Sequence, residues 1–371
     1  MNPKNLIDYF EIIPDPRVNR TLEHPLPNVL FIALCAVLCG AEHWTHIEEY
    51  GKANKKWLRQ ILHMPNGIPS HDTFGRVFAL LDPDALEQAL SAFVRDFAGE
   101  SAGKHIAMDG KTLRRSFDRA AEKNAIHMVT AWVHENHASF GQIKVNEKSN
   151  EITAIPQLLN LLDLKSSTVT IDAMGCQTAI AQKIVDGDAD YILALKGNQG
   201  TLHEEVAEFF DDALVRGFEV DLERYHDIDK GHGRIEERTL WLSREVDWLR
   251  DAGKWAGLTT IIAVQTKRTV DGNTSTERRH FIASGNKSAK DTAQLIRQHW
   301  SIENELHWTL DVVFGEDLCR IRKGNAAENM SRIRRIALSI LKKDKKARVG
   351  IQGRRLKAAW DHKYLVKLLR L

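Results

Sequence analysis

The chain has 371 residues, 43% of them hydrophobic and 27% charged, which is enough for two soluble domains with a core each. The longest apolar run, residues 29–41, is too short to span a bilayer, and residues 1–17 lack the basic-then-apolar order of an export signal. The four cysteines include no CxxC pair and predict no disulfide framework. We therefore expect a cytoplasmic protein without a membrane partner.

The net charge of +2 conceals an uneven distribution of charge along the chain. Residues 320–371 carry 17 basic and three acidic side chains, whereas the other 319 residues carry 35 and 47. A basic end on an acidic body favours a polyanion such as nucleic acid. A solvated helical face explains the same charges without any partner, and the composition does not decide between the two.

Residues 1–97 are predicted to form a helical N-terminal domain. We expect helices over residues 29–49, 47–62 and 71–81, with Ser70 capping the last. Two helices joined by a short turn containing glycine are typical of a helix-turn-helix DNA reader, and a plain helical bundle is the alternative.

Two cysteines and two histidines lie at helical spacing within the helix over 29–49, at positions 35, 39, 43 and 46. These are zinc-ligand residue types, but structural zinc sites normally draw ligands from separate elements. Buried thiols in a core helix are the favoured interpretation.

From residue 104 onward the pattern becomes rich in strands. Strands are predicted over 106–108, 127–133, 139–145, 169–171 and 191–195, and helices over 153–162, 176–185 and 202–214, with Pro156 in the first turn of its helix. Residues 218–284 interrupt this order as a β-rich insertion with strands over 238–242, 259–265 and 279–283, followed by helices over 288–314 and 326–343, the second basic and amphipathic. The order predicts an α/β fold with a mixed sheet.

Two aspartates stand where predicted strands end. Asp109 follows the strand over 106–108 and precedes Gly110, and Asp172 follows the strand over 169–171. Ligands of open α/β sheets bind beyond the carboxyl ends of the strands. Because lysine and arginine crowd around the first aspartate, this pattern indicates a metal facing a phosphate.

A magnesium site for phosphoryl transfer usually needs a further carboxylate, and the helix over 288–314 offers Glu303 and Glu305. Glu303 has apolar residues at helical spacing on both sides: Ile296, Trp300, Leu306 and Leu310. It is therefore predicted to face the core, where a carboxylate is costly unless it is paired or bound to metal. Glu305 has more polar neighbours and is predicted to lie on a wetter face.

Together these residues resemble a known family. Asp109, Asp172 and Glu303 resemble the acidic triad of DDE transposases of the RNase H-like superfamily. The blocks MDGKTLR, TIDAMGCQ, YILALKGNQ, GHGRIEER and HWSIENELHWTLDVVFGED are similar to bacterial insertion-sequence transposases of the H-repeat-associated group, over about residues 5–345. A related group has Tyr, Arg and Lys around the glutamate where this chain has Ile296, His299 and Leu310.

The resemblance implies an RNase H-like mixed sheet flanked by helices, with a β-rich insertion. It places a helical, transposase-associated DNA-binding domain at 1–97, the catalytic domain at 104–345 with the insertion at 218–284, and a basic tail at 346–371. It implies cleavage at insertion-sequence ends and joining to target DNA, with two Mg²⁺ or Mn²⁺ ions held by Asp109, Asp172 and Glu303. A dimer on double-stranded DNA, formed on terminal repeats, is expected.

Further residues are predicted to contact DNA because they follow strand ends, lie in the insertion or precede the glutamate. They are Lys111, Arg114, Lys196, Asn198, Gln199, His232, Arg234, Arg297, His299 and Trp300. Two alternatives remain open at this point: a hydrolytic nuclease of the same fold that cuts without joining, and a non-catalytic DNA-binding relic.

Overall fold

The computed structural model describes residues 5–18, 22–117, 124–145, 151–217, 219–231 and 233–370. They fall into two compact units. Unit 1 comprises Met1–Glu100, Gly110–Lys148 and Glu303–Leu371, and unit 2 comprises Ser101–Asp109 and Ser149–Ile302. No helix in the described ranges combines the length and apolar character needed to cross a membrane.

The N-terminal part of unit 1 is helical, as predicted. Its helices are α1 (Leu6–Glu11), α2 (Leu26–Leu38), α3 (Trp44–Ala53), α4 (Lys55–Leu58), α5 (His71–Leu80) and α6 (Pro83–Ala98). The Ser70 hydroxyl accepts a hydrogen bond from the backbone of Thr73, which confirms the predicted cap of α5. The single helix predicted over 29–49 was wrong: Gly40, with φ of 107°, follows α2 and separates it from α3.

The strands of the described residues form one mixed sheet in the order β3-β2-β1-β4-β5-β9-β8-β7-β6. They are β1 (His105–Thr112), β2 (His127–Val133), β3 (Ala138–Val145), β4 (Thr168–Ile171), β5 (Asp190–Leu195), β6 (Glu223–Gly231), β7 (Arg234–Ser243), β8 (Leu258–Val270) and β9 (Asn273–Ser284). β4 pairs in parallel with β1 and β5, whereas β2–β3 and all pairs from β5–β9 to β6–β7 are antiparallel. The predicted mixed sheet is confirmed, and the strands of the insertion extend it.

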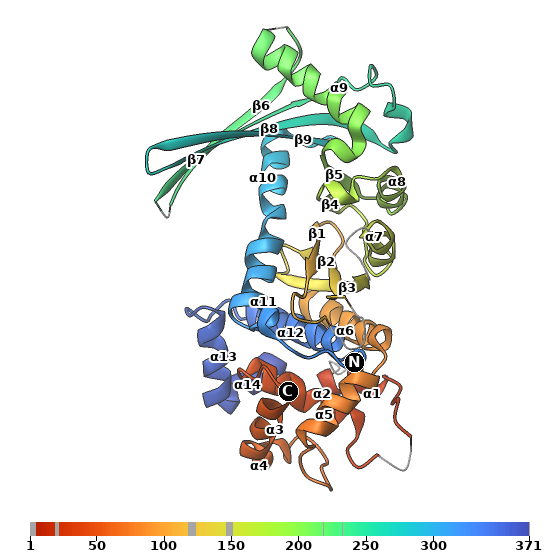
Figure 1. Cartoon of the computed structure of the whole chain (residues 1–371), viewed down its shortest axis with the longest axis vertical. Helices are drawn as coiled ribbons and strands as arrows, with labels where there is room; N and C mark the ends of the chain where they lie inside the picture. The colour runs from red at the N-terminus through yellow and green to blue at the C-terminus, as the bar shows by residue number, and fades with distance from the viewer. Residues whose placement is uncertain are drawn as a thin grey trace. The chain divides into compact units, whose positions relative to one another are not determined.

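Helices cover both faces of the unit 2 strands. Figure 1 shows α10 (Ala289–His299) and the pair α7 (Glu151–Leu159) and α8 (Thr178–Asp186) on opposite sides of β4 and β5. The helix α9 (Gly200–Asp211) packs against β9. Pro156 was predicted in a first turn, but it lies inside α7, where it removes one backbone hydrogen bond.

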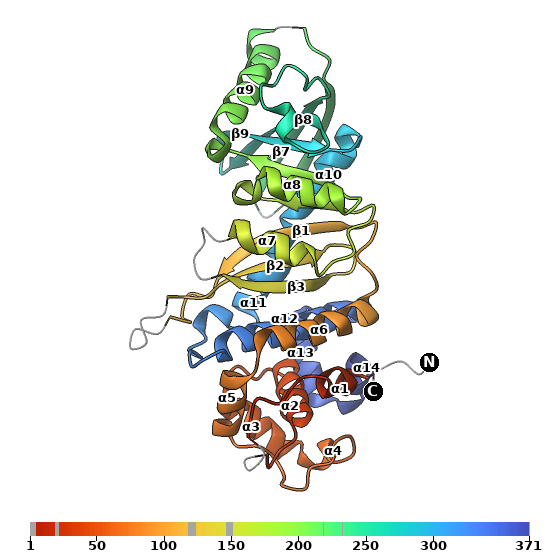
Figure 2. The same cartoon turned by 90° about the vertical axis from the view of Figure 1, so that its right-hand side faces the viewer.

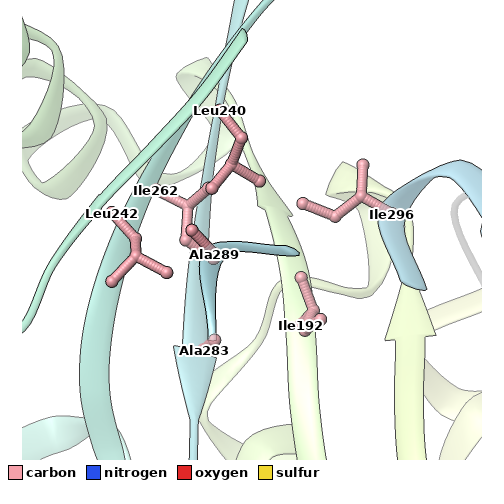
Figure 3. Close-up of a cluster of buried hydrophobic side chains, with 7 residues drawn as sticks. All are labelled: Ile192, Leu240, Leu242, Ile262, Ala283, Ala289 and Ile296. Atoms are coloured by element: carbon pink, nitrogen blue, oxygen red, sulfur yellow. The ribbon is translucent and has the colours of Figure 1, made fainter. Parts of the chain in front are cut away.

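The insertion joins unit 2 through a continuous apolar core. Figure 3 shows side chains from β5, β7, β8, β9 and α10 meeting in one cluster: Ile192, Leu240, Leu242, Ile262, Ala283, Ala289 and Ile296. All of them are buried. Because α10 anchors this cluster at two positions seven residues apart, its register on the sheet is fixed by packing.

In unit 1, the helix α12 (Ala326–Lys343) has the predicted bounds, but the basic amphipathic helix that was predicted is buried over Ala326–Leu341. It lies beside α6 under β3 (Figure 2), and its residues Arg332 and Arg335 are buried. Their guanidinium nitrogens lie 2.9 and 2.7 Å from the buried carboxylate of Glu87 on α6. The residues that follow form α13 (Ile351–Trp360) and α14 (His362–Leu369).

Candidate active site

The two predicted aspartates belong to neighbouring parallel strands of unit 2. Asp172 directly follows β4, as predicted, but Asp109 lies within β1, which continues past its predicted end at residue 108 to Thr112. β1 and β4 are paired in register up to Met108 opposite Ile171, so Asp109 and Asp172 are the next residues after the last paired positions of the two strands. Neighbouring strands lie about 4.8 Å apart, and residues in register point to the same side of a sheet. Both aspartates are half-buried, and Asp172 accepts a hydrogen bond of 3.1 Å from the backbone of Met174.

A chain of hydrogen bonds lies on the same side of these strands. The hydroxyl of Thr170 on β4 is 2.8 Å from His105 Nε2 on β1 and 2.8 Å from His299 Nδ1 at the end of α10. Strand alternation places His105 on the side of Asp109, and Thr170 on the side of Asp172. Burial lowers the pKa of His299 to about 4, so its imidazole is neutral near pH 7. The predicted contact of His299 with DNA stays a prediction.

The predicted glutamate belongs to unit 1, in a wide helical turn over Ile302–His307 with i→i+5 hydrogen bonding. The Glu303 side chain is 52% exposed, whereas that of Glu305 is 30% exposed, so the predicted orientations were wrong. A wide turn takes more residues than an α-helical turn, and the α-helical spacing used for the prediction does not continue through it. Such turns occur frequently at functional sites.

Glu305 is held in ion pairs within unit 1. Its carboxylate lies 2.9 Å from Nζ of Lys342 and 3.1 Å from Nδ1 of His137. Burial alone would raise the pKa of Glu305, but the contacts with His137 and Lys342 outweigh it and hold the pKa at about 2. Glu305 therefore serves as a structural carboxylate.

Within unit 1, Glu303 and His307 together offer a carboxylate and an imidazole that could serve as metal ligands. Carboxylate oxygens suit Mg²⁺ and Mn²⁺, and an imidazole nitrogen is a common ligand of transition metals. The sequence interpretation missed His307, which lies four residues after Glu303 with Nδ1 4.0 Å from its carboxylate. That i,i+4 spacing was the available signal. Within the described ranges, the cysteines and histidines at 35–46 form no such group.

The predicted DNA contacts after β5 tie two loops together. Nδ2 of Asn198 donates to the carbonyl of Ala173 at 2.6 Å, and Nε2 of Gln199 donates to the carbonyl of Cys176 at 2.8 Å. These bonds fasten the loop after β5 to the loop after β4, while Lys196 is exposed beside them. Asn198 and Gln199 therefore support the segment that follows the second aspartate.

The two predicted basic residues near the end of β1 differ in their surroundings. Lys111 is largely buried, pairs with Asp311 and lies 2.9 Å from a carboxylate oxygen of Glu316. The Arg114 side chain is 80% exposed, and its Nε lies 3.3 Å from Asp317. The guanidinium of Arg114 is therefore accessible to a ligand, whereas the ammonium of Lys111 connects parts of unit 1.

The remaining predicted DNA contacts belong to the insertion and the end of α10. Arg234 and Arg297 pair with carboxylates of the β6–β7 hairpin at 3.0 and 3.2 Å. Trp300 is 46% exposed, and the guanidinium of Arg279 lies 5.1 Å from the centre of its ring. His232 lies outside the described residues.

Comparison with known proteins identifies the family. The family model described as "Transposase DDE domain" matches residues 100–340, and the model described as "DDE_Tnp_1-associated" matches residues 7–94. The chain belongs to the DDE transposase family. Membership confirms the resemblance predicted from the five sequence blocks, and the helix-flanked mixed sheet agrees with the RNase H-like fold class.

Relatives of this transposase family member extend over its whole length. It is 42% identical over 373 residues to "Putative transposase YncI" of Escherichia coli O157:H7, covering all of this chain and 95% of that protein. It is 41% identical over 374 residues to "H repeat-associated putative transposase YhhI" of Escherichia coli K12, covering all of this chain and 98% of that protein. A shorter match, 40% over 77 residues and 21% of this chain, is to "Inactive transposase YbfQ" of the same strain.

Proposed function

We propose that this member of the DDE transposase family cuts DNA at the ends of an insertion sequence and joins the freed 3′-hydroxyl groups to target DNA. The observation that carries the proposal is the register of β1 and β4, which sets Asp109 and Asp172 on adjacent strands, facing one side of the sheet. Two carboxylates at one sheet edge are costly unless cations offset their charge. Family membership makes DNA the substrate class.

The donor set fits two hard divalent ions, Mg²⁺ or Mn²⁺, held by Asp109, Asp172 and Glu303. When bound, such ions offset the charge of the carboxylates and polarise the phosphate that reacts. The carboxylates serve as ionised ligands rather than as general bases. His307, beside Glu303, would orient that carboxylate, as partners of metal ligands commonly do.

The inclusion of Glu303 in the triad rests on family membership. The block HWSIENELHWTLDVVFGED, which contains Glu303, lies within the residues that the DDE domain model matches.

Contacts with double-stranded DNA would come from basic groups beyond the strand ends. Lys196 and Arg114 are exposed and able to meet phosphates, and Trp300 offers a ring for stacking on a base. We propose terminal repeats and target DNA as the ligands, with two chains acting as a dimer on DNA because two ends must be joined together.

The proposal is tested by incubating the purified chain with labelled duplexes carrying the flanking ends of its own gene, with Mg²⁺ or Mn²⁺. We expect nicks at the ends followed by joined products. Asp109→Asn and Asp172→Asn should each reduce cleavage by at least about 100-fold, because even outer partners of metal ligands cost 10- to 100-fold. Asp186→Asn, at an exposed position on α8, is the matched control and should cut normally.

Each outcome has a separate meaning. Calorimetry should show weaker Mn²⁺ binding in the two site variants and unchanged Mn²⁺ binding in the control. This measurement tests whether Asp109 and Asp172 bind metal without relying on activity. Undiminished cleavage by Asp109→Asn would contradict the proposed site. Cutting without joining would identify a hydrolytic nuclease. DNA binding without cutting would identify a non-catalytic relic.

A further inference from the structure

On unit 1, residues that are far apart in the sequence, some near the N-terminus and some near the C-terminus, form one surface. The Trp57 ring of α4 stacks on the His362 ring of α14, with centroids 4.8 Å apart and planes 11° from parallel. Nε2 of His362 also lies 2.7 Å from Oδ1 of Asn54, just before α4. These two contacts hold α4 against the start of α14.

The surface around these contacts is basic. We call it the α4–α14 basic surface and define it by the residues Lys55, Lys56, Arg59, Lys357, His362 and Lys363. All six side chains are exposed. It contains residues from the helical N-terminal region and residues from the basic C-terminal segment, which the sequence interpretation treated as separate parts of the chain.

Most of the charge on this surface has no counter-charge from the protein. Within the described ranges, no acidic side chain pairs with Lys55, Lys56, Arg59 or Lys363. The nearby Lys52, in contrast, pairs with two glutamates at 2.8 Å. A set of exposed cations without carboxylate partners produces a positive potential that attracts polyanions.

The acidic and aromatic residues beside the surface agree with this interpretation. Asp361 is the one acidic residue in the range 351–370, and its carboxylate accepts hydrogen bonds from the backbone of Lys363 and Tyr364 as the cap of α14. Trp360, immediately before it, is 78% exposed. An exposed aromatic ring among lysines is typical of surfaces that contact sugars or bases beside a phosphate backbone.

Much of the C-terminal basic excess is unsuited to this role. Arg332 and Arg335 are buried against Glu87, and the buried Arg355 donates to the carbonyl of Val37 at 3.0 Å. Of the exposed basic side chains in this segment, Lys357 and Lys363 belong to the α4–α14 basic surface.

We propose that the α4–α14 basic surface binds the phosphate backbone of double-stranded DNA, as a site separate from the acidic residues of the candidate active site. The choice of DNA as the polyanion rests on the proposed function. Phosphate contacts of this kind position a protein on DNA without reading its sequence. The surface would hold the duplex by its backbone while other residues act on it.

The test is a triple charge reversal, Lys55→Glu, Lys56→Glu and Lys363→Glu, in the full chain. Binding to a fluorescent duplex is measured by anisotropy from 50 to 200 mM salt. Because each phosphate contact contributes about 0.9 to the slope of log affinity against log salt, we expect the slope to fall by about 3. Affinity at 0.1 M salt should fall by more than about tenfold.

A matched variant controls for total charge: Lys165→Glu, Lys290→Glu and Lys323→Glu, at exposed positions outside the surface. In this control variant, the salt slope should decrease by less than half of the decrease seen in the first variant. Glutamine at Lys55, Lys56 and Lys363 gives a milder version if the reversal disturbs folding, which thermal melting will report.

The outcomes separate this proposal from the proposed function. If the triple reversal binds DNA with an unchanged slope, the surface is not a DNA site, whatever the cleavage assay shows. If it loses binding and the control does not, the surface is a DNA site even where wild-type protein fails to cut. Asp109→Asn should bind DNA as tightly as the wild type, because the surface is unchanged. If this variant loses DNA binding, the surface and the acidic residues do not act as separate sites.

Discussion

Glu87 offers the sharpest stability test, because its carboxylate neutralises two buried arginines. It lies on α6, fully inside unit 1, and contacts Arg332 at 2.9 Å and Arg335 at 2.7 Å. It also accepts hydrogen bonds from the hydroxyl of Ser91 at 3.0 Å and the backbone of Gln142 at 3.2 Å. We expect Glu87→Gln to destabilise the protein strongly.

The expected size of the effect follows from the burial of all three charged groups. Glutamine keeps the volume of Glu87, so no cavity forms, but Arg335 loses its counter-charge and Arg332 keeps only that of Glu328, at 2.8 Å. Breaking a buried ion pair by neutralising one partner costs about 3–5 kcal/mol. For a cooperative unit of roughly 200 residues, each kcal/mol lowers Tm by about 2–4 °C, which predicts a fall of about 6–20 °C.

The assay is thermal unfolding at pH 7, with Glu49→Gln as the control. Glu49 also faces a lysine, Lys52 at 2.8 Å, but its side chain is exposed, and such pairs contribute at most about 1 kcal/mol. Equal Tm shifts in the two variants would refute the reasoning. A melting curve of two transitions, with only one affected, would assign the loss to unit 1.

The pH dependence of this effect has a definite sign. Burial alone would raise the pKa of Glu87, but Arg335 and Arg332 outweigh it and hold the pKa below its ordinary value of 4.5. A carboxyl group whose pKa is lower in the folded state stabilises above its unfolded pKa and loses that contribution as pH falls through the folded value. The Tm difference between wild type and Glu87→Gln should be full at pH 7 and shrink below about pH 4.5.

Three further substitutions test other parts of the structure. Lys111→Met should lower stability by about 3–5 kcal/mol in denaturant unfolding, since it leaves the buried carboxylate of Glu316 unpaired; a change below 1 kcal/mol would contradict this. Burial lowers the pKa of His280 to about 4, so the wild type should lose stability as pH falls from about 6.5 to 4, and His280→Phe should flatten that part of the Tm profile. Gly324→Ala should lower Tm clearly more than Gly272→Ala: both glycines have positive φ, but only at Gly324 would a Cβ lie 2.5 Å from a backbone oxygen of α5.

The parts of the fold that follow local patterns were predictable from the sequence. The strand β2 and the helix α12 have the predicted bounds, because alternating or helically spaced apolar residues specify them locally. The placement of Asp109 and Asp172 beside each other likewise follows from the short buried segments that precede each aspartate, although β1 continues beyond Asp109 to Thr112. The strand β6 was not predicted, since its polar sequence carries no hydrophobic period.

Other features depend on interactions that a local pattern does not contain. The burial of Arg332 and Arg335 requires Glu87, which lies 245 residues before the first of them. Charge counts therefore predicted a solvated or DNA-binding face where the structure has an internal ion cluster. The wide turn at Ile302–His307 changed the helical phase, which is why the orientations of Glu303 and Glu305 were reversed.

The pairing of β5 with β9 has a consequence for how this protein can be shortened. Residues Ile192–Leu195 share their backbone hydrogen bonds with His280–Ala283 at the far end of the interrupting segment. Deleting that segment would leave one edge of β5 without a hydrogen-bonding partner. Such an edge can pair with another chain and cause aggregation. A shortened version of the protein must therefore retain β9 to pair with β5, even if the hairpin tips are dispensable.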